Sequence, residues 1–231
     1  GAARERAGAA VLEGGAGGFN WHADVAARKS RDLRVPRFTP PGGEPARDRV
    51  VNSAGDSQAG AIGASWADAD GFIGAALDTY RNDYGVTVEP DVTIDMKRDR
   101  LQFMGERKLS GPIERIEWTT GHTRYKHLEI EGSGEVGTTF ESRGSELRAQ
   151  AQHAPLALAG GALRGVFGTQ LEKLDFSALG EEAFVPDTKT KSGALFALEE
   201  WKGAAFLVSG GVRAERVPVK SAGDAPGAEE P

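Results

Sequence analysis

The stretch that decides the fold is RIEWTTGHTRYKHLEIEGSGEVGTTFESRGSELRAQAQ, residues Arg115–Gln152. Ile116 and Trp118 alternate with charged or small polar residues, and Leu147 and Ala149 alternate in the same way. Successive side chains of a strand point to opposite faces of its sheet, so this period of two predicts two strands. A polar, glycine-marked loop joins them. The stretch therefore predicts a hairpin with one apolar face and one charged face.

The same alternation recurs along the chain and predicts about ten strands of roughly 10–15 residues, longer than those of soluble sheets. Glycine-rich and proline-rich stretches separate them. No segment has a convincing helical period. The predicted fold class is therefore all-β, an antiparallel up-and-down meander. We expect strands at 4–13, 19–32, 58–67, 72–84, 93–107, 115–127, 138–152, 163–175, 188–201 and 204–216.

The connections between these strands alternate in length. The short ones are 14–18, 68–71, 108–114, 153–161 and 202–203, and the longer ones are 33–57, 85–92, 128–137 and 176–187. In a meander, alternate connections lie at the same end of the sheet. Short turns at one end and long loops at the other are typical of an outer-membrane β-barrel. We therefore expect the strands to form part of a transmembrane β-barrel.

Composition narrows the class of protein. The chain has 231 residues, 39% of them hydrophobic, with a net charge of −6 and no cysteine. The charge argues against nucleic acid as a partner, and the missing thiols exclude disulfides and thiolate metal sites. No apolar run approaches the ~18 residues of a membrane-spanning helix. Because the chain has neither an initiator Met nor a signal peptide, we expect it to be an internal fragment.

The two faces of the strands are expected to meet different surroundings. Near the short turns one face is apolar and would contact lipid, whereas the opposite face would line a wet lumen. The expected luminal residues are Asp24, Arg100, Glu106, Arg148, Gln150, Arg164 and Glu172. The expected aromatic girdle is Phe19, Trp21, Phe72, Trp118 and Phe206. The alternative is a soluble β-sandwich that uses the same aromatic side chains as its core.

Three stretches resemble the barrel of TonB-dependent outer-membrane receptors, most nearly the zinc-uptake branch. They are VVNSAGDSQAGAIGASWADADGFIGAALDTYRNDYGV (Val50–Val86), YKHLEIEGSGEVGTTFESRGSELR (Tyr125–Arg148) and FSALGEEAFVPDTKTKSGALFALEEW (Phe176–Trp201). The resemblance covers about Arg4 to Arg216. It implies a barrel of about 22 strands whose lumen holds a plug domain. Nothing here resembles a plug, so residues 1–231 are expected to be one partial barrel, roughly its first half.

The resemblance also implies a function for the intact protein. It would import a scarce, zinc-like metal or a metal chelate across the bacterial outer membrane into the periplasm. Its partners would be outer-membrane lipid, its own plug domain, the TonB complex acting through the TonB box of that plug, and the transported metal or metal chelate. Zinc would be cargo, with no resident cofactor. The alternatives are a passive or structural outer-membrane barrel and a soluble β-sandwich binding module.

The best candidate site is a His-Glu cluster in the charged part of the opening hairpin. His127, Glu129 and Glu131 alternate on an extended chain and so share a face, and imidazole and carboxylate both suit zinc. Tyr125 is expected to contact the same substrate. His122 would lie on the opposite face. The alternative is that these residues bind no metal and belong to a polar strand exposed to water.

Other candidates are weaker. Glu181 and Glu182 stand on a long loop and are expected to contact the substrate, although loop packing is the alternative. His22 and Asp24 would share the luminal face, and His153 is expected at the surface of a short turn. No catalytic motif is recognisable, so we expect no enzyme activity.

Overall fold

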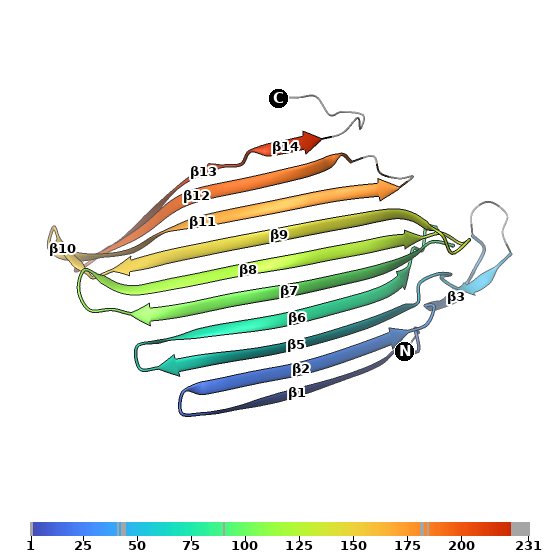
Figure 1. The fold of residues 1–231 in the computed structure, drawn as a ribbon, viewed down its shortest axis with the longest axis horizontal. Coiled ribbons are helices and arrows are strands. Elements are labelled where there is room, and N and C mark those ends of the chain that lie inside the picture. The colour runs from blue at the N-terminus through green and yellow to red at the C-terminus, as the bar shows by residue number, and fades with distance from the viewer. Residues whose placement is uncertain are drawn as a thin grey trace.

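The computed structural model describes residues 2–40, 42, 45–89, 91–180, 183 and 185–222. They form one curved sheet of twelve strands and a separate hairpin (Figure 1). The strands are β1 (Arg6–Ala16), β2 (Phe19–Ser30), β3 (Arg34–Phe38), β4 (Arg47–Arg49), β5 (Gly55–Asp68), β6 (Gly71–Gly85), β7 (Thr93–Lys108), β8 (Ile113–Ile130), β9 (Val136–His153), β10 (Leu156–Leu158), β11 (Gly161–Gly180), β12 (Asp187–Lys202), β13 (Leu207–Arg216) and β14 (Val219–Ala222). No helix capable of crossing a membrane occurs in the described part of the chain.

The strands follow one another in the sheet almost in chain order. The path is β1-β2-β5-β6-β7-β8-β9-β11-β12-β13, with β10 beside β11 and β14 beside β12. Every pair is antiparallel. Strands β3 and β4 form a small hairpin between β2 and β5. The predicted all-β up-and-down meander is therefore confirmed.

With one exception, the connections are sorted by length between the two ends of the sheet, as expected; the exception is 154–160, which contains β10 and is longer than 131–135 at the opposite end. The turns after β1, β5, β7, β9 and β12 lie at one end, and the connections after β2, β6, β8 and β11 lie at the other (Figure 1). The two-residue turn Gly17–Gly18 has φ of 59° and 92°. A two-residue hairpin turn of this kind needs positive φ at both positions, which glycine adopts without strain.

Several strands extend further toward the long loops than the alternation indicated. β8 and β9 have 18 residues each and β11 has 20. Residues 128–130, 136–137 and 176–180 were therefore wrongly expected to be loop. Each of these runs has five residues or fewer, too few to display the period of two by themselves, but in the structure they pair with neighbouring strands. Thr138, next to this extension, is fully buried.

The register separates the residues into two faces. Side chains directly opposite each other in neighbouring strands share a face. We call the face that carries Phe19 and Trp66 the outward face and the opposite face the luminal face. One row across the outward face is Phe19, Trp66, Ile73, Gly105, Trp118, Ala149, Thr169 and Leu195. Outward apolar side chains are widely exposed, with Ile62 at 60% and Leu195 at 68%. We call the outward apolar surface nearer the short turns the apolar band.

Neither face of the sheet carries a second layer in the described residues. The buried hydrophobic residues there are limited to Ile94, Ala178 and Ala194. A β-sandwich would bury its apolar face between two sheets about 10 Å apart. The sandwich alternative is therefore wrong as a description of the fold, because the aromatic side chains it would use as core lie on an open surface.

The register corrects one residue of the predicted girdle. Phe72 pairs with Glu106, so it lies on the opposite face from Ile73 and points into the lumen. Trp66, which the prediction omitted, lies opposite Phe19 on the outward face and is 54% exposed. The error arose because Phe72 begins its strand just after a glycine turn, where the sequence does not show which residue is first in register.

Candidate functional site

The luminal face carries a row of polar side chains that bond to one another across strands. All the predicted luminal residues, Asp24, Arg100, Glu106, Arg148, Gln150, Arg164 and Glu172, lie on this one face. Arg100 donates to Glu146 at 2.8 Å and Gln150 donates to Glu117 at 2.7 Å. The guanidinium of Arg148 lies 4.5 Å from the ring centre of Phe196. These contacts hold the luminal groups in place along the wall.

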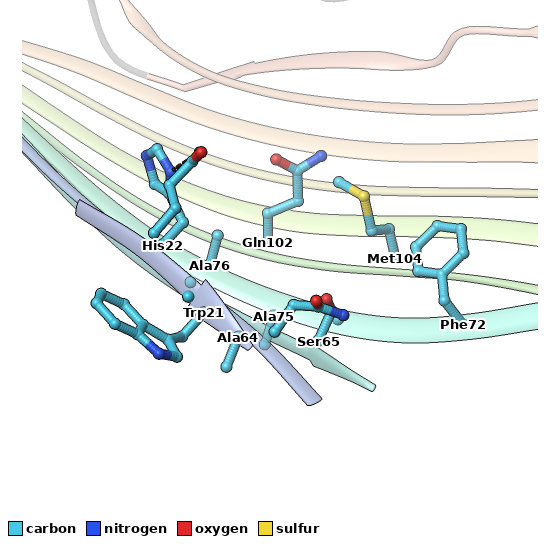
Figure 2. Close-up of a pocket in the computed structure, with 14 residues that line it drawn as sticks. Trp21, His22, Ala64, Ser65, Phe72, Ala75, Ala76, Gln102 and Met104 are labelled. Atoms are coloured by element: carbon cyan, nitrogen blue, oxygen red, sulfur yellow. Dashed lines mark hydrogen bonds and ion pairs between the residues drawn. The ribbon is translucent and has the colours of Figure 1, made fainter. Parts of the chain in front are cut away.

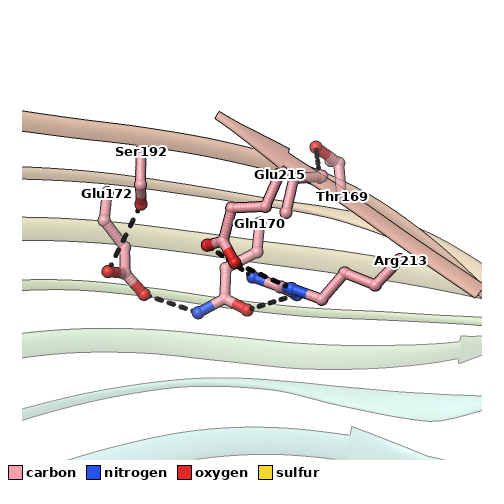
Figure 3. Close-up of polar contacts among 7 residues, drawn as sticks. Thr169, Gln170, Glu172, Ser192, Arg213 and Glu215 are labelled. Carbon is pink, nitrogen blue, oxygen red and sulfur yellow. Dashed lines mark hydrogen bonds and ion pairs between the residues drawn. The ribbon is translucent and has the colours of Figure 1, made fainter. Parts of the chain in front are cut away.

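The row continues to the last strands. Arg213 lies 2.9 Å from Glu215 and also donates to the amide oxygen of Gln170 at 3.3 Å, reaching across β12 (Figure 3). Gln170 in turn donates to Glu172. Figure 3 shows these side chains on one side of the sheet and Thr169 on the other. Because the groups are exposed, they could also bond to a polar partner inside the lumen.

A groove of about 580 Å³ lies near the short-turn end and is lined by residues of five neighbouring strands, β1, β2, β5, β6 and β7 (Figure 2). Phe72, Gln102 and Met104 point into the lumen there, whereas Trp21 points the other way. His22 stands at its side, with Nδ1 2.8 Å from Glu13 and Nε2 2.8 Å from Asp24. Both nitrogens of this ring are engaged, so the histidine is poorly placed to accept a metal.

The strongest candidate lies at the other end of the lumen, near the long loops. Tyr125 and His127 are two residues apart on the luminal face of β8, and the Tyr125 hydroxyl lies 2.8 Å from Nδ1 of His127. The ring of Phe140 lies 4.5 Å from that of His127, and Phe176 lies 6.4 Å beyond Phe140. We call Tyr125, His127, Phe140 and Phe176 the mouth cluster. Its aromatic rings support a single histidine orientation.

Burial sets the protonation of this cluster. It lowers the pKa of His127, which keeps the imidazole neutral at neutral pH. Burial, with a smaller contribution from Tyr84, raises the pKa of Tyr125, so its hydroxyl keeps its proton. A neutral imidazole is the form that binds metals. When Nδ1 carries the ring proton and donates it to the hydroxyl oxygen of Tyr125, Nε2 presents its lone pair to a metal.

The two glutamates of the predicted metal set stand further out. Glu129 continues the luminal alternation of β8 and pairs with Thr138. Glu131 lies in the turn after β8, with its carboxylate against Gly137. Among the described residues, no three His, Cys, Asp or Glu side chains converge as a metal-binding group. The set His127, Glu129 and Glu131 stays a prediction. Glu181 and Glu182 lie outside the described residues.

Met96 is a candidate ligand that sequence reasoning missed. In β7 it stands directly opposite His127 in β8, on the luminal face. Side chains directly opposite each other in an antiparallel pair have Cβ atoms about 5 Å apart. A thioether and an imidazole can therefore reach the same ion. Alternation along one strand shows which residues share a side of the sheet. Only the register between β7 and β8 shows that Met96 stands opposite His127.

The remaining histidines are placed as follows. His122 lies on the outward face, as predicted, and its Nδ1 is 2.9 Å from the hydroxyl of Ser145. His153 was wrongly expected to be plain surface. Its side chain is only 13% exposed and its Nε2 lies 3.0 Å from Glu199. Glu199 stands opposite Gly165 of the intervening strand β11, and its carboxylate crosses that glycine to reach His153, a relationship that depends on register between strands.

Comparison with known proteins shows the fold. No protein-family model matches the chain. A solved structure described as "Copper transporter OprC" matches with a TM-score of 0.62 and 14% sequence identity, over 96% of this chain. The match covers 38% of the transporter, so this chain spans less than half of that protein's length. The chain therefore has the fold of part of a transporter's β-barrel.

Proposed function

We propose that this chain is part of a TonB-dependent outer-membrane receptor that imports a metal ion or metal chelate into the periplasm. The observation that carries the proposal is the division of the wall into two faces. An exposed apolar band covers one, and a row of paired polar groups covers the other. The fold match to a transporter along nearly the whole chain supports it.

The two ends of the lumen would have different tasks. At the long-loop end, the mouth cluster would receive the metal, with His127 as ligand and Tyr125 holding its ring. Glu129, Glu131, Glu181 and Glu182 would add oxygen ligands. Further down, Arg100 and the other luminal groups would hold a plug domain by polar contacts. The TonB complex would pull on that plug to release the metal. The plug and the other strands would belong to the rest of the protein.

Zinc is the first candidate cargo, since imidazole and carboxylate both bind it. Copper is the second, for a specific reason. Met96 places a thioether opposite His127, and soft sulfur ligands select Cu(I). The matched structure is described as a copper transporter. His127 would bind zinc if the glutamates complete its coordination. It would bind Cu(I) if Met96 does.

An uptake experiment tests the proposal. Cells that produce the intact protein are given zinc or copper at low concentration, and cell metal is measured with and without an uncoupler of the inner membrane. We expect uptake that depends on the protein and stops with the uncoupler. His127→Ala should lower it, whereas His122→Ala, on the outward face of the same strand, should not. Uptake that continues unchanged with the uncoupler would indicate a passive barrel instead.

The membrane placement has its own test. The intact protein should require detergent or lipid to remain monodisperse, because the apolar band is exposed along the whole sheet. A protein that is monodisperse in plain buffer would contradict the lipid-facing role of that band.

A further inference from the structure

Beyond the apolar band, toward the long loops, the outward face becomes charged. On β11 the outward residue after Leu171 is Lys173, and on β12 Lys191 lies just beyond Gly193 and Leu195. No polar spacer separates the two zones on these strands. Lipid packed on the apolar band would therefore place its headgroups against these charges, since a headgroup begins where the hydrocarbon ends.

The charge of this zone differs between the two halves of the sheet. On β2, β5, β6 and β7 cations and anions are mixed. Lys29 lies 2.7 Å from Asp56, and Lys97 lies 2.8 Å from Asp99. From β8 onward, cations predominate among the described outward residues. We call them the basic belt: Arg124, Lys126, Arg143, Lys173, Lys189, Lys191 and Lys220. The described carboxylates on that face there are Glu141, Asp175 and Asp187.

Within the basic belt, like charges stand directly opposite each other. The register pairs Arg124 with Arg143, Lys173 with Lys191, and Lys189 with Lys220. Such pairs destabilise a sheet, because the Cβ atoms are only about 5 Å apart. A sheet that keeps three of them on one face has a reason other than its own stability.

The carboxylates nearby do not neutralise the belt. Glu141 is shared between Lys126 at 3.3 Å and Arg143 at 3.5 Å. Asp175 pairs with Lys173 at 2.8 Å and faces Lys189 across the strands. Two carboxylates thus serve four of the seven cations, and positive charge remains in excess. The excess points outward from the barrel wall and not into the lumen.

We propose that the basic belt binds the phosphate groups of anionic lipids that surround the barrel at the long-loop end. The inference rests on the membrane placement under the proposed function. Lysine and arginine form strong charge-assisted hydrogen bonds with phosphate oxygens, and clusters of them beside a membrane select anionic headgroups. A bound phosphate would bridge cations that otherwise repel each other, so lipid would stabilise this half of the wall.

The test uses the intact protein purified in a neutral detergent. Lipid bound to the protein is measured by native mass spectrometry as phosphatidylglycerol or phosphatidylcholine is titrated in. We expect a clear preference for phosphatidylglycerol. The double variant Lys173→Gln, Lys191→Gln should lose roughly 30-fold in affinity for it, since each surface lysine is worth about fivefold toward an anionic lipid. Lys29→Gln, on the same face but outside the belt, should change it little.

The other outcomes would overturn the inference. Equal affinity of the double variant and the wild type for phosphatidylglycerol would show that the belt does not bind it. Displacement of the lipid by inorganic phosphate at similar concentration would indicate a site for small anions. Binding of both lipids without preference would reject this inference but keep the membrane placement. Binding of neither lipid, with a protein monodisperse in plain buffer, would reject both.

Discussion

The hydroxyl of Tyr125 lies 2.8 Å from Nδ1 of His127, two residues along the same strand. The contact engages Nδ1 of the ring, so that Nε2 is the nitrogen that takes a metal when the ring proton is on Nδ1. Neighbours of this kind tune metal ligands and typically matter 10–100-fold for metal affinity. The pair is the part of the candidate site in which the structure brings two predicted residues together.

Tyr125→Phe tests the role of this contact. The ring of His127 would keep its packing on Phe140 but lose the partner of Nδ1. We expect metal affinity of the intact receptor to fall about tenfold, measured by calorimetry with zinc and copper. His127→Ala should abolish binding at the site, and His122→Ala should leave it unchanged. Equal affinity for Tyr125→Phe and the wild type would remove Tyr125 from the site.

Met96→Leu tests the identity of the metal. Leucine has a similar volume and no sulfur, so the packing of the wall should be preserved. If Cu(I) binds between Met96 and His127, its affinity should fall at least tenfold while zinc affinity remains the same. A parallel loss for both metals would point to a change in packing. No loss for either would leave Met96 outside the site. Met104→Leu, also luminal but near the short turns, is the matched control.

The His153–Glu199 contact predicts a pH dependence of stability at the short-turn end. The hydrogen bond to Glu199, and then that to the carbonyl of Ala154, raise the pKa of His153. A raised folded-state pKa means that the contact stabilises the fold fully below about pH 6.5, the usual value of histidine. The contribution is lost as the pH rises through the raised pKa. We therefore expect the Tm in detergent to fall between pH 6 and pH 8.5.

The variant Glu199→Gln should reduce that pH dependence, because the amide cannot pair with a charged ring. Glu200→Gln, next in sequence but on the opposite face, should retain it. A wild-type Tm independent of pH over this range would show that the contact contributes nothing to stability.

Gly168 marks a close approach in the luminal wall. A Cβ at this position would lie 2.6 Å from Cζ of Phe196 and would also meet the carbonyl oxygen of Ala149. The absence of a side chain lets Arg148 reach Phe196 across β11. We expect Gly168→Ala to lower the free energy of unfolding by about 1–3 kcal/mol. Gly210→Ala, where a Cβ would meet open space, should change it little. Thermal unfolding in detergent compares the two.

The fold was largely predictable because one physical rule governs most of the chain. A wall that is apolar outside and polar inside imposes period two, and Ile116, Trp118, Leu147 and Ala149 display it directly. The rule fails where a run is short and mixes large, small and polar residues without alternation. Residues 176–180 (FSALG) therefore read as loop although β11 continues through them. It also fails at strand starts, where one residue of uncertainty reversed the side of Phe72.

The candidate site was predictable only in part, for a related reason. Alternation within β8 placed Tyr125 and His127 on one face, and the structure brings them together. It could not show that Phe140 from β9 covers His127 or that Met96 from β7 faces it. Those relationships depend on register between strands, which turn geometry and packing decide. For candidate ligands on long loops, such as Glu181 and Glu182, alternation gives no prediction at all, because it applies only to strands.

The strand order of Figure 1 has a consequence for assembly. Because almost every strand pairs with the one before it in sequence, each new strand finds its template already formed beside it. The loop that must close is usually short, as at Gly17–Gly18, so each step costs little chain entropy. The sheet can therefore form by sequential addition of strands, one hairpin at a time. The β2–β5 connection, interrupted by β3 and β4, is where that growth should pause.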